Sequence, residues 1–360
     1  MRVLQLIDSL DTGGAERMSV NLANALSDEV DGSYLCATRA EGLLKASINP
    51  EVSYLFLKKR SVFDLAALYR FYRLVSKEQI SIIHTHSSSF FLGTLTKLMY
   101  PKVKLIWHDH YGNSELLTKR PYKILRFCSR FFDMVFCVNT ALVTWNRIHL
   151  KTPHIEFLSN FVLPSKTINK TSELNGRTGK RILCLANLRP QKDHLSLLKA
   201  FRKVHSLFPE WTLHLVGKDF NDGYSNQIKQ YISKEHMDAS VFLYGSKSDT
   251  EYIISQCDIG VLSSISEGLP LSLIEYGFGG LAVVATDVGD CRRVIKDYSV
   301  GKLVKPNDTE AMSDCLVSYI EDAVHRKDIG HNLKVFVQDY FSKEAIIKSL
   351  ILNYKKVLSR

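Results

Sequence analysis

Two glutamates with seven residues between them carry the clearest chemical signal in this sequence. The pattern around Glu267 predicts a turn and then a helix that begins near residue 271 and carries Glu275 about one turn in. A carboxylate there can accept two hydrogen bonds from a vicinal diol such as a ribose. The N–H groups at the helix start attract phosphate oxygens. The first four of the seven intervening residues, Gly268, Leu269, Pro270 and Leu271, are the candidates for this contact. The alternative is two surface glutamates, which the apolar neighbours disfavour.

Two basic side chains follow an apolar run at the start of the second half of the chain. Arg189 and Lys192 come soon after residues 181–185. A planar guanidinium and a compact ammonium could together clamp a diphosphate at the end of that strand. The alternative interpretation is an ordinary solvated basic surface.

A pair of glycines forms a second candidate anion site near the N-terminus. Gly13 and Gly14 separate the first apolar run, residues 2–7, from a helical pattern. Glycines at such a turn let a ligand approach the backbone, and N–H groups at the helix start attract anions. The alternative is a tight structural turn, because glycine is common at turns.

Short apolar runs alternate with helical patterns along the whole chain. Their nearly continuous hydrophobicity suits strands buried on both faces of parallel sheets joined by right-handed crossovers. The predicted strands are 2–7, 81–84, 103–108, 134–138, 181–185, 212–216, 241–244, 259–262 and 281–285. The predicted fold class is therefore α/β, with two doubly wound sheets. Ligands are expected at the carboxyl ends of the strands, in a cleft where loops of both domains converge.

The length of 360 residues fits two domains. The polar, breaker-rich segment 166–180 predicts a linker between an N-terminal domain, residues 1–165, and a C-terminal domain, residues 181–340. The last segment, about 341–360, predicts an amphipathic helix that could pack back on the N-terminal domain.

The charge balance indicates an anionic partner. Lys and Arg number 47 against 37 Asp and Glu, a net charge of +10, which suits nucleic acid, an acidic membrane surface or a phosphorylated small molecule. The basic residues are dispersed and no RNA-recognition or helix-turn-helix signature occurs, so nucleic acid is the least favoured of the three. Seven scattered cysteines indicate reduced thiols of a cytosolic protein. No apolar stretch approaches the roughly 20 residues that span a bilayer.

A basic segment favours the membrane surface among these partners. Residues 116–132 hold five basic side chains and no acid, and Pro121 can open a helix there. The basic face would comprise Lys123, Arg126 and Arg130, and the apolar face Leu125, Cys128 and Phe132. Such a helix can lie on an anionic leaflet. The alternative, weighted equally, is a core-packed helix with a wet basic face.

Together these motifs resemble the family 4 glycosyltransferases, whose GT-B fold has two Rossmann-like domains facing a central cleft. The resemblance rests on the two glutamates, the Arg189–Lys192 pair, the 13–16 Gly-Gly-Ala-Glu sequence and a late turn at 301–304, and it covers nearly the whole chain. It implies a retaining transferase that uses a nucleotide-diphosphate sugar as donor, with the acceptor on the N-terminal domain, residues 1–165, and the nucleotide sugar on the C-terminal domain, residues 181–340. By resemblance, Arg189 and Lys192 hold the donor diphosphate, Glu275 the ribose and Glu267 the transferred sugar, while Gly13, Gly14 and residues 268–271 border the donor.

Family members also carry a histidine, or an acid, near the sugar after a strand of the first domain. Two registers fit this sequence, one with His110 and one with His108, and we prefer His110. Its imidazole could hydrogen-bond a sugar hydroxyl or a developing charge, although a structural histidine is the alternative for either. His84 and His86 follow another strand, but with Asp109 their spacing is not diagnostic of a metal site. No metal site and no cofactor are predicted.

The resemblance implies a mechanism without a bridging metal, since no Asp-x-Asp sequence is present. Basic residues and helix N-termini would stabilise the leaving diphosphate, and a front-face displacement would pass the acceptor's proton to it. The acceptor would be a glycan or a polyprenyl-linked sugar in cell-surface polysaccharide assembly. The protein would then work in the cytoplasm, on the inner face of the cell membrane if the basic segment binds lipid. The alternatives are a sugar-nucleotide epimerase with the same fold and a non-catalytic basic binding protein.

Overall fold

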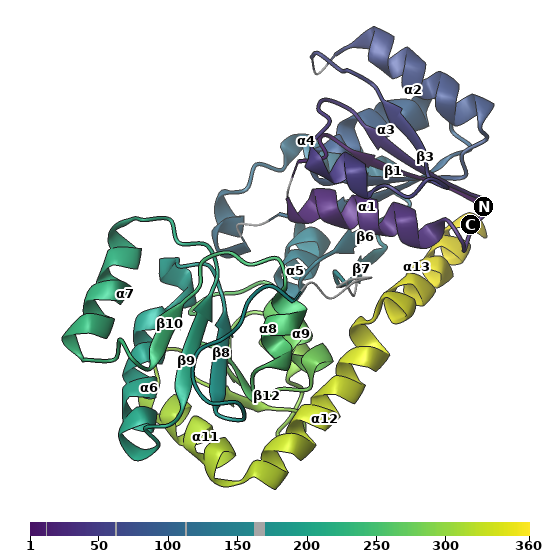
Figure 1. Ribbon diagram of the computed structural model, residues 1–360. Coiled ribbons are helices and arrows are strands. Elements are labelled where there is room, and N and C mark those ends of the chain that lie inside the picture. Colours follow the sequence, from purple (N-terminus) through teal and green to yellow (C-terminus); the bar gives the residue numbers. More distant parts are fainter. Residues whose placement is uncertain (12, 62, 112–113, 162–169) are drawn as a thin grey trace. The chain divides into compact units, whose positions relative to one another are not determined.

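The computed structural model describes residues 1–11, 13–61, 63–111, 114–161 and 170–360, and of residues 114–116 the backbone alone (Figure 1). The chain divides into two compact units. Unit 1 comprises Met1–Phe161 and Lys343–Arg360, and unit 2 comprises Val162–Ser342. The C-terminal helix thus belongs to unit 1. Each unit has its own sheet, its own core and its own cavity.

Unit 1 is built on a seven-stranded sheet in the order β3-β2-β1-β4-β5-β6-β7, and every neighbouring pair is parallel. Its strands are β1 (Arg2–Ile7), β2 (Gly32–Ala37), β3 (Ser53–Phe56), β4 (Ile82–His86), β5 (Lys104–Asp109), β6 (Met134–Cys137) and β7 (Ile155–Phe157). The strand order reverses between β1 and β4. In such sheets ligands bind outside the carboxyl ends of the strands at this reversal.

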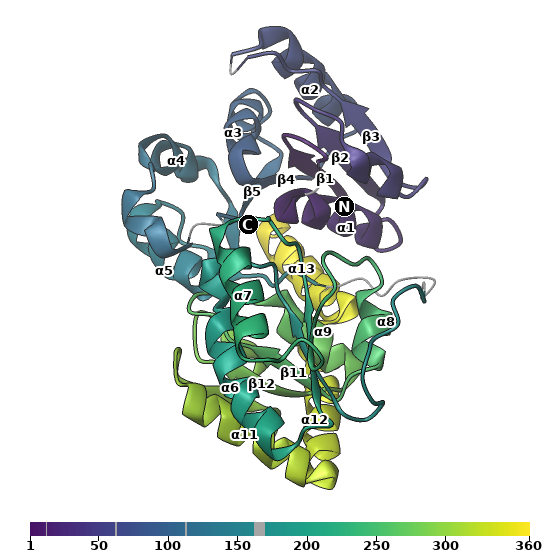
Figure 2. The ribbon, with the colours of Figure 1, turned by 60° about the vertical axis from the view of Figure 1, so that its left-hand side comes forward.

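Helices cover both faces of this sheet because alternate strand residues point to opposite sides. Leu4 and Leu6 pack under helices of one face, whereas Val3 packs under helices of the other. The first face carries α2 (Leu65–Lys77), α3 (Phe90–Met99), α4 (Lys123–Cys128) and α5 (Thr140–His149). The second carries α1 (Gly14–Leu26) and α13 (Lys343–Leu358) (Figure 2).

Unit 2 repeats the same plan with a six-stranded parallel sheet in the order β10-β9-β8-β11-β12-β13. Its strands are β8 (Arg181–Leu185), β9 (Thr212–Val216), β10 (Val241–Leu243), β11 (Ile259–Leu262), β12 (Ala282–Thr286) and β13 (Lys302–Val304). One face packs against α6 (His194–Leu207), α7 (Gly223–Lys234) and α11 (Thr309–Glu321); the other packs against α8 (Thr250–Ser255), α9 (Leu271–Gly279), α10 (Cys291–Val294) and α12 (Ala323–Phe341). The predicted fold class, α/β with two parallel sheets, is confirmed.

Two predicted features differ from the structure. The late turn at 301–304 is in fact the edge strand β13, which pairs with β12 through residues 302–304. Of the predicted linker, residues 166–169 lie outside the described residues, while residues 170–180 pack on unit 2. The carboxylate of Asp249 accepts hydrogen bonds from the N–H groups of Thr171 at 3.0 Å and Ser172 at 2.7 Å, and Leu174 is buried in the core. The polar sequence of this segment therefore satisfies buried hydrogen bonds rather than forming a free linker.

The basic helix predicted after Pro121 is shorter than expected. Residues 114–119 and 129–131 form 3-10 turns, and only α4 between them is α-helical. The burial nevertheless follows the predicted division, because Leu125, Cys128 and Phe132 are buried while the basic side chains are exposed. Among the described residues, none of the helices is both long enough and apolar enough to cross a bilayer.

Candidate functional site

Unit 2 has a cavity at the carboxyl ends of β8 and β9 that gathers most of the residues predicted to hold a donor. Its volume is about 440 Å³. Of the predicted site residues it is lined by Lys192, Glu267, Leu269, Pro270, Leu271 and Glu275. The cavity therefore joins two sequence motifs that lie some 75 positions apart in the chain.

The lysine and the first glutamate form an ion pair inside this cavity. Lys192 Nζ lies 2.6 Å from Glu267 Oε1, and Ser264 Oγ donates to the same carboxylate oxygen at 2.6 Å. The carbonyl of Lys192 accepts a hydrogen bond from Ser263 Oγ at 2.8 Å. Because the Glu267 side chain is only 8 % exposed, this pairing compensates a carboxylate that would otherwise be poorly solvated.

A glycine that sequence reasoning missed fixes the backbone at Glu267. Gly289 has φ +53°, and a Cβ on it would lie 2.1 Å from the carbonyl oxygen of Glu267. The N–H of Asp290 donates to the carbonyl of Gly268 at 2.9 Å. Only glycine combines that dihedral with so close an approach. In the sequence, Gly289 was detectable as a glycine shortly after the predicted strand at 281–285, where a loop at the carboxyl end of the sheet is expected.

Glu275 lies on α9, which begins at Leu271 as the sequence predicted. Pro270 precedes the helix and supplies no side-chain cap, so N–H groups of the first turn remain available to an anion. Burial, with a smaller contribution from the neighbouring Glu251, raises the pKa of Glu275 to about 7. A carboxylate held this way gains from a ligand that donates hydrogen bonds to its charged form.

Arg189 does not join Lys192 in the cavity. Its side chain is exposed, and its guanidinium carbon lies 4.4 Å from the centre of the Phe220 ring. Locally, Arg189 has an extended backbone before Pro190, and the 3-10 turn 190–192 that follows contains Lys192. The expected clamp of two cations is thus not assembled in this structure.

Other polar residues of this cavity were not singled out from the sequence. Asn187, Ser246, Lys247, Thr250 and Ser272 also line it. Lys247 adds a second positive side chain to a cavity that already contains Lys192. Asn187 was detectable in principle, because it lies two positions after the predicted strand 181–185. The segment 246–250 carried no such signal.

The two N-terminal glycines lie in unit 1, at the start of α1. Gly13 is the residue before the helix, and its N–H donates to the carbonyl of Asp11 at 2.9 Å. A Cβ on Gly14 would meet no atom within 4 Å. The backbone at Gly14 is therefore open to close approach, as a phosphate-binding turn requires.

Unit 1 has a larger cavity of about 1590 Å³, open to solvent at the carboxyl edge of its sheet. His110 lines this cavity, whereas His108 has no exposed surface. Of the two registers considered, the structure thus gives cavity access to His110. His108 packs inside the core beneath it, with ring centres 4.0 Å apart.

Four histidines form a stacked column in unit 1. His84, His86 and His108 are fully buried, and the ring planes of His84 and His86 are 13° apart with centres separated by 4.8 Å. Tyr354 of α13 bonds to His84 Nδ1 through its hydroxyl at 2.6 Å, and His110 Nε2 lies 3.0 Å from His86 Nδ1. Burial lowers the pKa of His84 and of His110 to about 3. The imidazoles are therefore neutral at physiological pH.

The column also brings possible metal-binding atoms together. The ring nitrogens of His84, His86 and His108 lie within 4.8 Å of one another. The rings of His84 and His86, and of His84 and His108, are nearly parallel, at 13° and 23°. The rings of His86 and His108 are tilted by 36°, and all three rings are buried in the core of unit 1.

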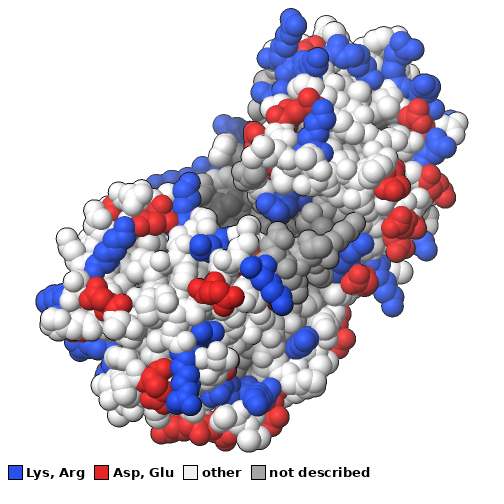
Figure 3. Space-filling view, in the orientation of Figure 1, with Lys and Arg blue, Asp and Glu red and all other residues white. Residues whose placement is uncertain are grey.

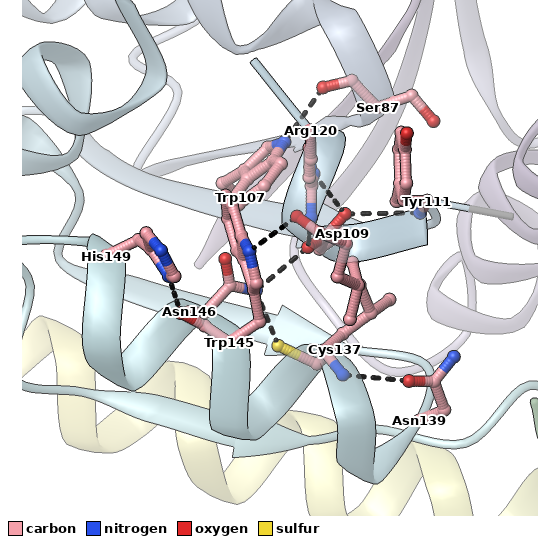
Figure 4. Close-up of polar contacts among 12 residues, drawn as sticks. Ser87, Trp107, Asp109, Tyr111, Arg120, Cys137, Asn139, Trp145, Asn146 and His149 are labelled. Carbon is pink, nitrogen blue, oxygen red and sulfur yellow. Dashed lines mark hydrogen bonds and ion pairs between the residues drawn. The ribbon is translucent and has the colours of Figure 1, made fainter. Parts of the chain in front are cut away.

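A buried ion pair supports the loop that follows β5 (Figure 4). The two terminal guanidinium nitrogens of Arg120 donate to the Asp109 carboxylate, at 2.7 and 2.8 Å, and Asn146 Nδ2 donates to it at 2.8 Å. The guanidinium also stacks on the rings of Tyr111 at 4.4 Å and Trp145 at 4.5 Å. This network holds the wall of the unit 1 cavity next to His110.

Comparison with protein families matches each half of the chain. Residues 12–165 match the family model described as Glycosyltransferase Family 4, and residues 165–335 match the model described as Glycosyl transferases group 1. The two matches meet at the boundary between the halves and leave only the chain ends uncovered.

Similar proteins include enzymes of bacterial glycan assembly. The chain is 26% identical over 290 residues, 72% of each protein, to the Escherichia coli UDP-Gal:alpha-D-GlcNAc-diphosphoundecaprenol alpha-1,3-galactosyltransferase. It is 23% identical over 350 residues, 94% of each protein, to the Campylobacter jejuni GalNAc-alpha-(1->4)-GalNAc-alpha-(1->3)-diNAcBac-PP-undecaprenol alpha-1,4-N-acetyl-D-galactosaminyltransferase. Among solved structures, Anabaena Alr3699/HepE in complex with UDP superposes with a TM-score of 0.80 at 18% identity, over 99% of this chain and 100% of that one. The last similarity establishes the GT-B fold.

Proposed function

Because the chain belongs to the family 4 glycosyltransferases, we propose that it transfers a sugar, with retention of configuration, from a nucleotide-diphosphate sugar to a glycan or polyprenyl-linked acceptor in cell-surface polysaccharide assembly. The observation that carries the proposal is the unit 2 cavity, in which Lys192, Glu267 and Glu275 gather around the start of α9. The similarity to enzymes named for undecaprenol-linked acceptors supports the acceptor class.

The donor would occupy this cavity in one orientation. The Glu275 carboxylate accepts the two ribose hydroxyls, and the free N–H groups at the start of α9 face the diphosphate. Lys192 exchanges part of its pairing with Glu267 for the diphosphate, which leaves Glu267 free to hydrogen-bond the sugar. Arg189 would leave Phe220 to reach the leaving group.

The reaction we propose is a front-face displacement. The bond between the sugar's anomeric carbon and the diphosphate oxygen breaks, the bond to the acceptor oxygen forms on the same face, and the acceptor's proton passes to the departing diphosphate. Lys192 and the α9 N-terminus stabilise the charge that develops on that leaving group. Burial lowers the pKa of His110 to about 3, which makes its imidazole a weak base, so it would orient a hydroxyl rather than take its proton.

We propose that this chemistry needs no metal ion, since lysine and helix N–H groups supply the positive charge at the diphosphate. Transfer is expected to continue in the presence of EDTA at an undiminished rate. A loss of activity that added Mg²⁺ or Mn²⁺ restores would contradict this part of the proposal.

The function is tested in two steps. A thermal-shift screen against UDP-, GDP-, ADP- and CDP-sugars identifies the donor, because a ligand at 100 times its Kd stabilises the fold by about 2.7 kcal/mol. Nucleotide release is then followed with and without a lipid-linked acceptor, and the product's anomeric configuration is read by NMR. Sugar-nucleotide conversion without any acceptor would indicate an epimerase, and an inverted product would contradict retention.

We further propose that unit 1 binds the anionic inner face of the cell membrane. Lys and Arg side chains gather over the α2 region of this unit (Figure 3), and α4 exposes Lys123 and Arg126. Purified protein should sediment with anionic vesicles at low salt and less so at high salt. Equal sedimentation with neutral vesicles would contradict the electrostatic part.

A further inference from the structure

A buried glutamine interrupts the apolar sequence of a central strand in unit 1. Gln5 of β1 has no exposed surface, and its neighbours on the same face of the sheet, Val3 and Ile7, belong to the core. Buried side-chain amides are hydrogen-bonded in nearly all proteins, because an unpaired amide in the core destabilises the fold. The partners of this amide are His86, at the end of β4, and Tyr354 on α13, which are also fully buried. The proposed reaction assigns no role to these three residues.

The direction of the hydrogen bonds is set at Tyr354. Its hydroxyl oxygen lies 2.6 Å from His84 Nδ1. Hydrogen bonds donated by N–H groups to oxygen usually measure roughly 2.7–3.2 Å, and those donated by hydroxyl groups are shorter, so Tyr354 donates its single proton to His84. Toward Gln5 the same oxygen can then only accept, and Gln5 Nε2 donates to it at 3.4 Å. The Gln5 amide is thereby oriented with its oxygen toward His86.

The amide oxygen of Gln5 determines which nitrogen of His86 carries the proton. Gln5 Oε1 lies 2.8 Å from His86 Nε2, and because a carbonyl oxygen can only accept, His86 Nε2 is the donor. Burial lowers the pKa of His86 well below its ordinary value, so the ring is neutral and holds a single proton. His86 Nδ1 therefore has a lone pair and can only accept.

His110 donates to this lone pair from the edge of the unit 1 cavity. His110 Nε2 lies 3.0 Å from His86 Nδ1, so the proton of His110 is on Nε2. Burial lowers the pKa of His110 to about 3, which leaves its Nδ1 without a proton at pH 7. His110 is partly exposed and lines the cavity. Within the described part of the chain, no hydrogen bond reaches its Nδ1.

The hydrogen bonds thus form one continuous chain from the cavity to the C-terminal helix, and all of them run in the same direction. The chain ends at His84, whose Nε2 has no hydrogen-bond partner among the residues that the structure describes. A buried N–H group without a partner destabilises the fold, and an apolar side chain would avoid this cost. Buried polar chains of this kind are typical of side chains that hold a functional group in one orientation.

We propose that Tyr354, Gln5 and His86 are positioning residues that fix His110 in one tautomer, with the proton on Nε2 and the lone pair of Nδ1 directed to a ligand. In this tautomer His110 accepts a hydrogen bond from a hydroxyl group. It disfavours a carbonyl, ether or phosphate oxygen at the same position, because two lone pairs would then meet. The ligand part of this inference rests on the proposed function, whereas the tautomer does not.

The tautomer is measured by NMR on the full-length protein with ¹⁵N-labelled histidine at pH 7. Protonated and unprotonated ring nitrogens have separate ¹⁵N chemical shifts, and the pair of signals that is missing from the His110→Gln variant belongs to His110. We expect a protonated Nε2 and an unprotonated Nδ1. A proton on Nδ1 would overturn the inference, because the chain of hydrogen bonds would then run in the opposite direction.

Tyr354→Phe tests whether the hydroxyl on α13 directs the tautomer. Without this hydroxyl the Gln5 amide can adopt either orientation, so both tautomers of His110 become populated and its two ¹⁵N shifts should move toward each other. Tyr319→Phe is the matched control, because Tyr319 is also fully buried but lies in unit 2. Shifts in Y354F that equal those of the natural protein would contradict the role of Tyr354. Gln5→Leu, which removes the acceptor of His86, provides the same comparison if Y354F does not fold.

Transfer kinetics test the ligand part of the inference. In Y354F, kcat/KM should fall about two- to tenfold, because only molecules with the productive tautomer bind the hydroxyl, and Y319F should keep the rate of the natural protein. Equal rates in these variants despite mixed tautomers in Y354F would show that Nδ1 contacts no reacting hydroxyl. If the tautomer is as expected but no nucleotide sugar binds, the proposed function fails and the tautomer assignment stands. If transfer proceeds with the proton on Nδ1, this inference fails and the proposed function stands.

Discussion

Lys192 Nζ lies 2.6 Å from Glu267 Oε1 in the unit 2 cavity, so the cation proposed for the donor diphosphate is already paired with the carboxylate proposed for the sugar. Ser264 holds the same carboxylate oxygen at 2.6 Å. A bound donor would replace this ion pair by two contacts, one between its diphosphate and Lys192 and one between its sugar and Glu267. Binding of the diphosphate at Lys192 would therefore also free Glu267 for the sugar.

The first prediction concerns this lysine. Lys192→Ala should lower kcat/KM roughly 100-fold, because one stabilising charge at the developing anion contributes about 2.7–4 kcal/mol. Steady-state rates of nucleotide release with acceptor present would measure the change. Lys199→Ala, at an exposed position on α6 outside the cavity lining, is the matched control and should retain full activity. A K192A enzyme as active as the control would remove Lys192 from the donor site.

The second prediction concerns the pH dependence of donor binding. Burial and the nearby Glu251 raise the pKa of Glu275 to about 7, and the ribose hydroxyls bind its charged form. Below pH 7 the carboxyl must lose a proton before it can accept both hydroxyls, so affinity should fall about tenfold per pH unit, and above pH 8 it should be constant. Calorimetric titration of the intact nucleotide sugar, whose diphosphate does not titrate in this range, provides the measurement.

Glu275→Gln separates this explanation from a general effect of acid. The amide cannot ionise. At pH 8 the variant should therefore bind the nucleotide sugar about tenfold more weakly than the natural protein does, because the hydrogen bonds to a charged carboxylate are lost. The variant's affinity should not vary between pH 6 and 8. If the variant kept the slope of the natural protein, another group would be responsible. If its affinity at pH 8 were unchanged, Glu275 would not contact the ribose.

The strands of both cores were predictable because burial on two faces produces continuous apolar runs. Residues 2–7, 181–185, 212–216 and 259–262 were predicted with the bounds that the structure shows. The strands not predicted include β3 and β7, which lie at the two edges of the unit 1 sheet and have four and three residues. A short edge strand has little apolar sequence of its own, and its pairing depends on the neighbouring strand.

The site was predictable in residue type but not in contacts. Glu275 and Lys192 line one cavity as expected, since both follow motifs at the carboxyl ends of strands. The stacking of Arg189 on Phe220 depends on side chains 31 positions apart, and the closeness of Gly289 to Glu267 depends on two loops. Such contacts arise from tertiary packing; the sequence offers at most a glycine after a predicted strand, and not the contact that this glycine makes.

The third prediction concerns the Asp109–Arg120 pair. Arg120→Ala would leave a carboxylate that is 1% exposed without its cation, which typically costs about 3–5 kcal/mol. At about 2–4 °C per kcal/mol for a unit of this size, the Tm of unit 1 should fall by on the order of 10 °C. Arg120→Lys should lose part of this stability, because an ammonium cannot form the two parallel hydrogen bonds. Arg130→Ala, at an exposed position, is the control; an equal effect of R130A and R120A on the Tm would contradict a stabilising role of the pair.

The fourth prediction concerns acid stability. Burial lowers the pKa of His84 and His110 to about 3 and lowers those of His86 and His108, so each is neutral when folded but takes up a proton below about pH 6.5 when unfolded. Protonation of these rings therefore does not affect the free energy of unfolding above pH 6.5. As the pH falls from 6.5 toward 3, the free energy of unfolding decreases by up to about 1.4 kcal/mol per pH unit for each ring. The free energy of unfolding, measured by urea denaturation at pH 7, 6 and 5, should show this slope. His108→Phe keeps an aromatic ring at this position and should reduce the slope by up to about 1.4 kcal/mol per pH unit, the contribution of one proton. His325→Asn, at an exposed position, should leave it unchanged; an unaltered slope in H108F would mean that His108 is already protonated in the folded protein.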